Sequence, residues 1–144
     1  MTIRCEIVSQ DRTVFAGDVD IVVLPGAAGE MGILPKHAPV LTALKFGIIK
    51  IRKGGKEEVF TVAGGIAEVQ PDIVTVLADA AENVQEIDIA RADAARVRAE
   101  EALAKGVPAD NDSYLAMEAA LRKSNLRLEA ARRYSKTRNP YSEQ

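Results

Sequence analysis

Apolar and polar residues alternate along the first part of the chain, up to about Ala81, and glycine and proline interrupt the alternation at short intervals. A period of two residues is typical of β-strands that bury one face, with Gly and Pro in the turns between them. Residues 18–24 begin with strict alternation and then become continuously apolar until Pro25-Gly26. The pattern predicts an all-β half, in which residues 18–24 form one strand that ends at the proline.

Two hairpins are predicted within this half. Gly54-Gly55 separates the alternating segments 47–52 and 56–62, and a Gly-Gly pair tolerates the positive φ angles of a two-residue turn. Pro71, with its fixed φ, marks a second turn before the strand pattern of residues 73–77. Several strands at this spacing indicate a sandwich or a flattened barrel.

After Ala81 the β-branched residues become scarce, and the helix-favouring Ala, Arg and Glu take over. Asp88 is the predicted N-cap of a helix over residues 89–105. Gly-Val-Pro at residues 106–108 should stop this helix. Small residues recur on one narrow face, which permits close approach of a second helix: Ala92, Ala95, Ala99 and Ala102.

A second helix is predicted over residues 113–134, with caps offered by Asn111, Asp112 and Ser113. Its apolar seam has spacings of three, four and seven residues: Tyr114, Met117, Leu121, Leu128 and Ala131. The two helices therefore form an antiparallel hairpin. Because each buries only a narrow face, we expect a partner surface, either the β domain or another protein, to decide where the hairpin rests.

Composition narrows the range of functions. The 144 residues are 47% hydrophobic, only 4% aromatic, and carry a net charge of −2. The chain has few aromatic residues on which bases could stack, and it lacks the net positive charge of a nucleic-acid-binding domain. No nucleic-acid partner is therefore expected. The N-terminal residues do not resemble a signal peptide, and no segment approaches the ~20 apolar residues that cross a bilayer. We expect a soluble, cytosolic chain without direct membrane insertion.

Catalytic chemistry is also restricted. Cys5 is the only cysteine and His37 the only histidine, which excludes an intramolecular disulfide and a zinc site built from such ligands. The glycines of residues 25–32 fit neither the dinucleotide fingerprint nor a P-loop, so we expect an inter-strand loop with Glu30 exposed at its tip. His37 has no second base or nucleophile beside it, and it either pairs with Glu30 or fixes a turn. The sequence predicts no enzyme and no metal site.

Basic residues gather in the helical half. Arg91, Lys123 and Arg127 could together grip a polyphosphate, or they form a solvated basic face. After position 121 only Glu129 and Glu143 oppose a run of basic residues: Arg122, Lys123, Arg127, Arg132, Arg133, Lys136 and Arg138. Such a run is either solvated or binds an acidic protein surface.

Three ordered motifs connect the chain with a known family. They read GEMGILPKHAPVLT at residues 29–42, GGIAEV at residues 64–69 and VTVLAD at residues 74–79. With them the chain resembles the epsilon subunits of bacterial F-type ATP synthases, which are called delta in mitochondria. The resemblance spans nearly the whole chain.

The resemblance implies a ten-stranded β-sandwich in residues 1–84, which binds the gamma subunit and the ring of c subunits, and a regulatory hairpin in residues 85–144. Glu30 and His37 match the loop that faces the c ring. The family's hairpin lies compact or extends toward the alpha and beta subunits, where it inhibits ATP hydrolysis. Its inhibitory basic helix, which meets an acidic segment of beta, is matched here by Arg122, Lys123, Arg127, Arg132 and Arg133. Such a subunit is a peripheral part of the F1 sector on the cytoplasmic side of the cell membrane.

Some members of the family bind ATP through a motif that this chain matches as IDIARA, residues 87–92, which includes Asp88, Arg91 and Ala92. Glu82 matches a further position of that site. The two arginines of the second helix correspond to Lys123 and Arg127, and lysine keeps the charge but loses the planar fork of donors. No cofactor is required on this interpretation, and ATP is a regulatory ligand.

Two functional hypotheses follow. The first is a non-catalytic rotor subunit of the central stalk that couples proton translocation to ATP synthesis and restrains hydrolysis. The alternative is a free-standing ATP-sensing or protein-binding module, in which the hairpin is the functional site and the β domain a scaffold. Co-purification with gamma separates them.

Overall fold

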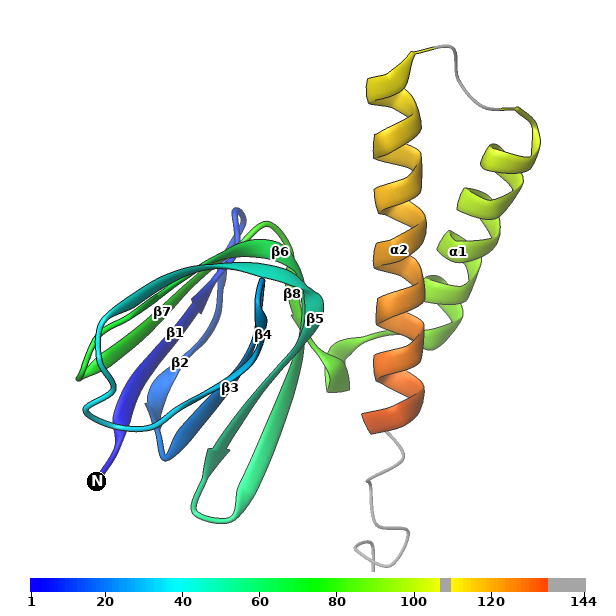
Figure 1. Cartoon of the computed structure of the whole chain (residues 1–144). Helices are drawn as coiled ribbons and strands as arrows, with labels where there is room; N and C mark the ends of the chain where they lie inside the picture. The colour runs from blue at the N-terminus through cyan, green and yellow to red at the C-terminus, as the bar shows by residue number, and fades with distance from the viewer. Residues whose placement is uncertain (107–109, 135–144) are drawn as a thin grey trace, which may run out of the picture. The chain divides into compact units, whose positions relative to one another are not determined.

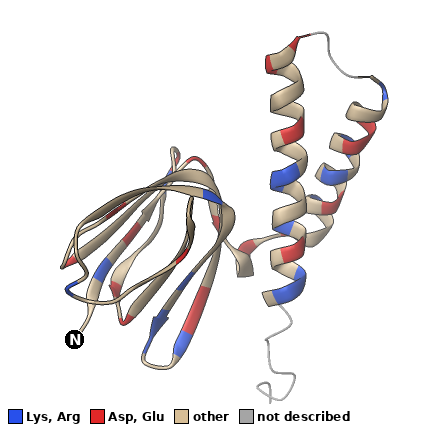
Figure 2. Ribbon diagram, in the orientation of Figure 1, with Lys and Arg blue, Asp and Glu red and all other residues tan. Residues whose placement is uncertain are grey.

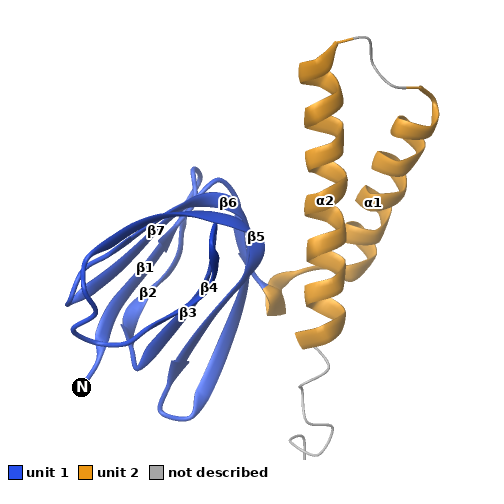
Figure 3. Cartoon of the chain, viewed as in Figure 1, with its two compact units in different colours: residues 1–83 blue, residues 84–144 orange. Residues whose placement is uncertain are grey.

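The structure is a computed structural model that describes residues 1–106 and 110–134. It contains two compact units, residues 1–83 and residues 84–144 (Figure 3). Parts of two sequence-based predictions lie outside the described residues: Val107 and Pro108 of the helix stop, and Lys136, Arg138 and Glu143 of the basic run.

The first unit contains only strands and their connections (Figure 1). They are β1 (Ile3–Val8), β2 (Thr13–Val19), β3 (Ile21–Gly26), β4 (Gly29–Ile33), β5 (Val40–Lys53), β6 (Lys56–Val69), β7 (Ile73–Ala78) and β8 (Ala81–Asn83). Their hydrogen-bonded order is β2-β1-β7-β6-β5-β3-β4, and β8 pairs with β6. β1 and β7 are parallel, and the other neighbours are antiparallel.

The predicted fold class, a β-sandwich followed by two helices, is confirmed. The described residues contain eight strands rather than ten. β5 and β6 each run through 14 residues, and β6 changes its neighbour on one side along its length. β6 pairs first with β8 and then with β7, and the change occurs at Gly64 and Gly65, with φ 85° and 137°, where Gly65 is the first residue opposite β7.

The inward side chains of the strands form one apolar core, and each large aliphatic side chain buried there stabilises the fold by about 1.5–3 kcal/mol. Phe15 of β2 contacts Phe60 of β6, with ring centroids 5.8 Å apart and the planes tilted by 59°. The largest fully buried side chains are Phe60, Ile3, Ile7, Leu24, Ile33, Ile49, Val19, Val22, Val62, Val69, Val74 and Val76.

Both predicted hairpins are present. β5 and β6 are joined through Gly54-Gly55, with Lys53 opposite Lys56, and β6 and β7 are joined through the turn at Pro71, with Val69 opposite Val74. Local turn chemistry was sufficient to predict both hairpins, although each turn also bonds to a distant segment, Gly54 to Asp20 and Pro71 to Lys36.

The prediction of one strand over residues 18–24 is wrong. The chain bends at Asp20, which separates β2 from β3. The Asp20 amide donates to the carbonyl of Arg52 at 2.7 Å, and its Oδ2 accepts from the amide of Gly54 at 2.9 Å. Asp20 thus fastens this corner to the β5–β6 hairpin. Pro25 does not end the strand, since β3 continues through it to Gly26.

The second unit consists of the short 3-10 helix η1 (Val84–Glu86) and the helices α1 (Ile89–Ala104) and α2 (Asn111–Tyr134), which run antiparallel (Figure 1). The predicted small-residue face and apolar seam are both used. Ala92 is fully buried on α1, and Leu128, Ala130 and Ala131 are buried on α2. Neither helix, over the residues described, is long and apolar enough to span a membrane.

The helix ends match the predictions in part. Asp88 caps α1 as predicted, and α1 ends at Ala104, followed by Gly106 at φ 135°. The cap of α2 is Asp110 and not one of the three residues that follow it. Its carboxylate accepts from the Ser113 hydroxyl at 2.8 Å and from the Asp112 amide at 3.1 Å, and these bonds lower the pKa of Asp110.

Candidate functional site

A row of apolar side chains crosses four strands on the outer face of the first unit. Val8, Leu77, Ile66 and Ala43 lie opposite one another in the ladder from β1 through β7 and β6 to β5. Leu77 is 55% exposed and Ile66 48%, although large aliphatic residues on an outer face are usually replaced by polar ones. We call these four residues the outer apolar row.

Polar and acidic groups border this row. The next row on the same face lies two residues away along each strand and consists of Leu41, Glu68, Thr75 and Glu6. Leu41 is 73% exposed. Apolar residues rimmed by charge are typical of surfaces that bind another protein. Sequence analysis did not identify this surface, although its signal was present: Leu77 alternates with the inward Val74 and Val76 and therefore points outward.

The connection between β4 and β5 contains His37. Its amide donates to the carbonyl of Leu34 at 3.2 Å, and its ring Nδ1 lies 2.7 Å from the Ala38 carbonyl oxygen, to which the Nδ1–H tautomer donates. Of the two predicted alternatives, His37 therefore fixes a turn instead of pairing with Glu30. Glu30 lies at the start of β4 and His37 beyond its end, so the structure places them at opposite ends of that strand.

This connection is fastened to the β6–β7 turn. The Lys36 amide donates to the carbonyl of Pro71 at 2.8 Å. A shallow groove of about 390 Å³ lies beside it, lined by Pro39, Val40, Leu41, Glu68, Val69 and Gln70. Leu34, at the first position of the turn, is 58% exposed.

The segment IDIARA, residues 87–92, which is predicted to bind nucleotide, lies at the start of α1. The Asp88 Oδ1 accepts from the Arg91 amide at 3.1 Å, Ala92 is fully buried, and the Arg91 side chain is exposed. The motif therefore has a local structural use, with Asp88 as the cap and Ala92 in the helix interface. Glu82 belongs to β8 in the other compact unit.

The basic residues of α2 differ in exposure. Lys123 and Arg127 stand one helical turn apart, the first exposed and the second half-buried. Arg122, Arg132 and Arg133 are exposed, and the Arg133 guanidinium lies 5.4 Å from the ring centre of Tyr134. Basic residues recur along α2 toward its C-terminal end (Figure 2).

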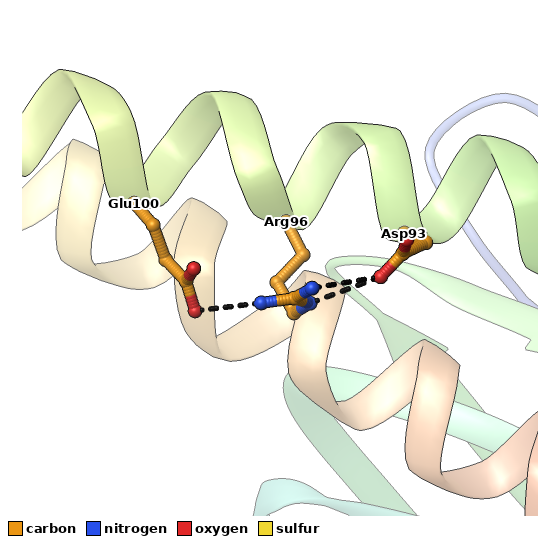
Figure 4. Close-up of polar contacts among 3 residues, drawn as sticks. All are labelled: Asp93, Arg96 and Glu100. Atoms are coloured by element: carbon orange, nitrogen blue, oxygen red, sulfur yellow. Dashed lines mark hydrogen bonds and ion pairs between the residues drawn. The ribbon is translucent and has the colours of Figure 1, made fainter.

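Sequence analysis did not single out Arg96, which is held between two carboxylates of its own helix (Figure 4). It contacts Asp93 at 2.9 Å, three residues back, and Glu100 at 2.9 Å, four residues on. The hydrogen bond to Asp93, and then that to Glu100, raises the pKa of Arg96.

Arg96 lines an open groove of about 640 Å³ in the hairpin, together with Asn125, Leu128, Glu129, Arg132 and Arg133. Arg127 lies two residues from both Asn125 and Glu129, about 200° around the helix at 3.6 residues per turn. The predicted nucleotide residues Lys123 and Arg127 therefore face away from this groove.

Comparison with known proteins agrees with this geometry. Residues 2–84 match the model of the ATP synthase delta/epsilon chain β-sandwich domain, and residues 85–132 match that of the delta/epsilon chain long α-helix domain. The chain is 48% identical over 137 residues to the ATP synthase epsilon chain of Dehalococcoides mccartyi, which covers 93% of this chain and 95% of that protein. It is 45% identical over 142 residues to that of Bordetella petrii, with 97% and 99% covered.

The fold is also similar to a chain in the solved Euglena gracilis mitochondrial ATP synthase assembly of OSCP, F1 and c-ring. The TM-score is 0.71 at 28% identity, with 90% of this chain and 81% of the other covered. A chain of the Tetrahymena thermophila mitochondrial ATP synthase central stalk and c-ring shares the fold at a TM-score of 0.62 and 11% identity, with 91% and 97% covered. From both matched domains and these full-length relatives, the chain belongs to the ATP synthase delta/epsilon chain family.

Proposed function

We propose that the chain is a non-catalytic subunit of the central stalk of an F-type ATP synthase, where it couples proton translocation to ATP synthesis. Both domain models and relatives named ATP synthase epsilon chain support this assignment. Residues 1–84 dock on the rotor and residues 85–144 regulate it. The subunit acts as a peripheral part of the F1 sector, on the cytoplasmic side of the membrane.

The outer apolar row is the observation that carries the docking role. Ile66 and Leu77 are large, lie opposite each other in the ladder and are about half exposed. Burial of their exposed surface by a partner would therefore stabilise the complex. Full burial of such a side chain is worth about 1.5–3 kcal/mol. We assign this row to the gamma subunit.

The β4 strand and its two ends are assigned to the c ring. Glu30 is exposed at one end, and at the other the bonded turn around His37 presents Leu34 to solvent. A turn fastened to the β6–β7 turn is a rigid support for a contact surface, because its backbone loses little freedom on binding.

The hairpin is proposed to be the regulatory part. Arg122, Lys123, Arg127, Arg132 and Arg133 give α2 a basic surface that fits an acidic segment of beta and would inhibit hydrolysis there. ATP is the proposed ligand of the hairpin, bound by the exposed Arg91 of α1 and by Lys123 and Arg127 of α2, while Asp88 and Ala92 of the same motif support the start of α1. The resemblance also names Glu82.

ATP binding would bias the hairpin without switching it completely. A ligand at 100 times its dissociation constant stabilises the bound state by about 2.7 kcal/mol. Moving a population from 1:99 to 99:1 needs about 5.5 kcal/mol. Contacts with gamma and beta would have to supply the difference.

The docking role is tested by co-purification of gamma with the full chain. Ile66→Ser and Leu77→Ser should weaken gamma binding by roughly three- to tenfold each, since a partner can bury only the exposed half of each side chain, worth about 0.7–1.5 kcal/mol. Thr75→Ser, on the same face of β7, is the matched control and should bind as the wild type does. Retention of gamma by the double variant Ile66→Ser, Leu77→Ser would refute this docking face, and failure of the wild type to bind gamma would favour the free-standing module.

The regulatory role has its own test. A chain that ends at Glu86 keeps the β unit and lacks both long helices. In a reconstituted complex it should raise ATP hydrolysis above the rate with the full chain. Equal rates would remove the inhibitory role and leave the docking role intact.

A further inference from the structure

The connection after β4 contains the one non-glycine residue with positive φ in the part of the chain that the structure describes. This is Lys36, at φ 66°. Pro35 precedes it, and the His37 amide donates to the Leu34 carbonyl, which closes a four-residue turn from Leu34 to His37. Proline at the second position and positive φ at the third are the signature of a type II turn.

Lysine is an unfavourable choice at this position. The third position of a type II turn favours Gly or Asn, because a Cβ with a long side chain strains the left-handed conformation. The amide of Lys36 makes its bond to Pro71 regardless of the side chain, so the fold does not require lysine here. A residue that violates local preference without a structural gain indicates a functional position.

The Lys36 side chain is exposed, and the backbone that carries it is held by hydrogen bonds. The Lys36 amide is bonded to Pro71, and the next carbonyl of that turn, of Asp72, accepts from the Arg4 amide at 3.1 Å, so three segments are joined at this point. The backbone at Lys36 is therefore fixed in position, and the side chain extends from it into solvent.

We propose that Lys36 is a contact residue of the ring-facing surface and that its ammonium binds an acidic side chain of the c ring. The proposal rests on the assignment of this end of the β unit to the ring and adds to it a residue and a charge. Lysine is kept in a strained turn position because a cation is needed there, and the bonds to Pro71 and Leu34 hold the turn that presents it.

Four substitutions separate the backbone from the charge. Lys36→Gly and Lys36→Asn suit the left-handed conformation and remove the ammonium, whereas Lys36→Arg keeps a cation and Lys36→Glu reverses it. The F1 sector reconstituted with each chain is titrated onto membrane vesicles that are stripped of F1 and retain the c ring. Thermal unfolding of each chain is measured in parallel.

Lys36→Gly and Lys36→Asn should unfold at or above the wild-type temperature and yet bind the vesicles roughly two- to fivefold more weakly, the range of an exposed ion pair. The difference should disappear near 1 M salt, where charges are screened. Lys36→Arg should bind as the wild type does, and Lys36→Glu more weakly than Lys36→Gly. Wild-type binding by Lys36→Gly, or equal loss in Lys36→Arg and Lys36→Gly, would overturn the proposal.

Leu34→Ala and His37→Ala test the underlying surface. If both weaken vesicle binding and Lys36→Gly does not, only the role of Lys36 fails. If neither weakens binding, the assignment of this end to the ring fails, and the role of Lys36 fails with it.

Discussion

The Oδ1 atom of Asp88 accepts a hydrogen bond from the backbone amide of Arg91, at 3.1 Å. Both residues belong to the proposed nucleotide motif, and this bond gives one of them a structural use that does not depend on a ligand. The carboxylate satisfies a free amide in the first turn of α1. Loss of ATP binding on removal of Asp88 would therefore not by itself identify a ligand contact.

The cap predicts a stability difference between two substitutions at position 88. Asp88→Ala should destabilise α1 by about 1 kcal/mol because the Arg91 amide loses its acceptor, whereas Asp88→Asn keeps an acceptor and should cost little. Thermal unfolding of the two variants, followed by the helical circular dichroism signal, measures this. Equal losses in the two variants would show that the negative charge, and not the cap, is what matters.

ATP binding is predicted to depend on Arg91. The Arg91 side chain is exposed, so Arg91→Ala should leave the fold intact and weaken ATP binding by at least tenfold in calorimetry, the effect of about 1.4 kcal/mol from a charged contact. Lys105→Ala, an exposed basic residue at the other end of α1, is the control. Absence of heat with the wild type at millimolar ATP would refute the nucleotide proposal.

Gly65, where β6 begins to pair with β7, is predicted to tolerate no side chain. A Cβ there would lie 2.3 Å from the Leu77 carbonyl oxygen and 2.8 Å from the Ala78 Cα, at a φ of 137° that disfavours other residues. Gly65→Ala should therefore cost more than about 3 kcal/mol in unfolding free energy, the range of severe backbone strain. Gly32→Ala, whose Cβ would meet only Ile21 Cδ1 at 3.8 Å, should cost far less. Urea unfolding compares the two variants, and similar midpoints would contradict the predicted clash at Gly65.

Cys5 predicts a loss of stability at alkaline pH. Burial raises the pKa of its thiol from 9.0 to about 12, so between these values the unfolded chain loses a proton that the folded chain keeps. The stability that Cys5 contributes is complete below pH 9 and falls as the pH rises toward 12.

Cys5→Ala should be less stable overall because of the lost packing, but it should show a shallower decline in unfolding free energy between pH 9 and pH 11. The difference in slope isolates the thiol from the other titrating groups. Parallel curves for wild type and variant would contradict the raised pKa.

The features that the sequence predicted correctly are those set by neighbouring residues. The hairpin at Gly54-Gly55 and the cap at Asp88 each depend on a few adjacent positions. The break at Asp20 was missed because its cause is long-range: the acceptor and the donor that hold it, Arg52 and Gly54, lie more than 30 residues away. Alternation alone cannot reveal such a bond.

The candidate surfaces also depend on long-range structure that a local sequence pattern does not reveal. A period of two indicates that Leu77 and Ile66 lie on one face of their own strands, but the strand order and register decide that they meet in one row with Val8 and Ala43. The three- and four-residue spacing of Asp93, Arg96 and Glu100 was readable from the sequence. The position of Arg96 in a groove with α2 could not be predicted, because it depends on how the two helices pack.

ATP-driven proton pumping tests the central claim most directly. Membrane vesicles carrying the ATP synthase are reconstituted without the chain and then with it, and acidification of the lumen is followed at equal rates of ATP hydrolysis. A rotor subunit that docks on gamma and the ring should restore pumping per ATP hydrolysed, and Ile66→Ser, Leu77→Ser should fail to do so. Equal pumping with and without the chain would contradict its place in the rotor.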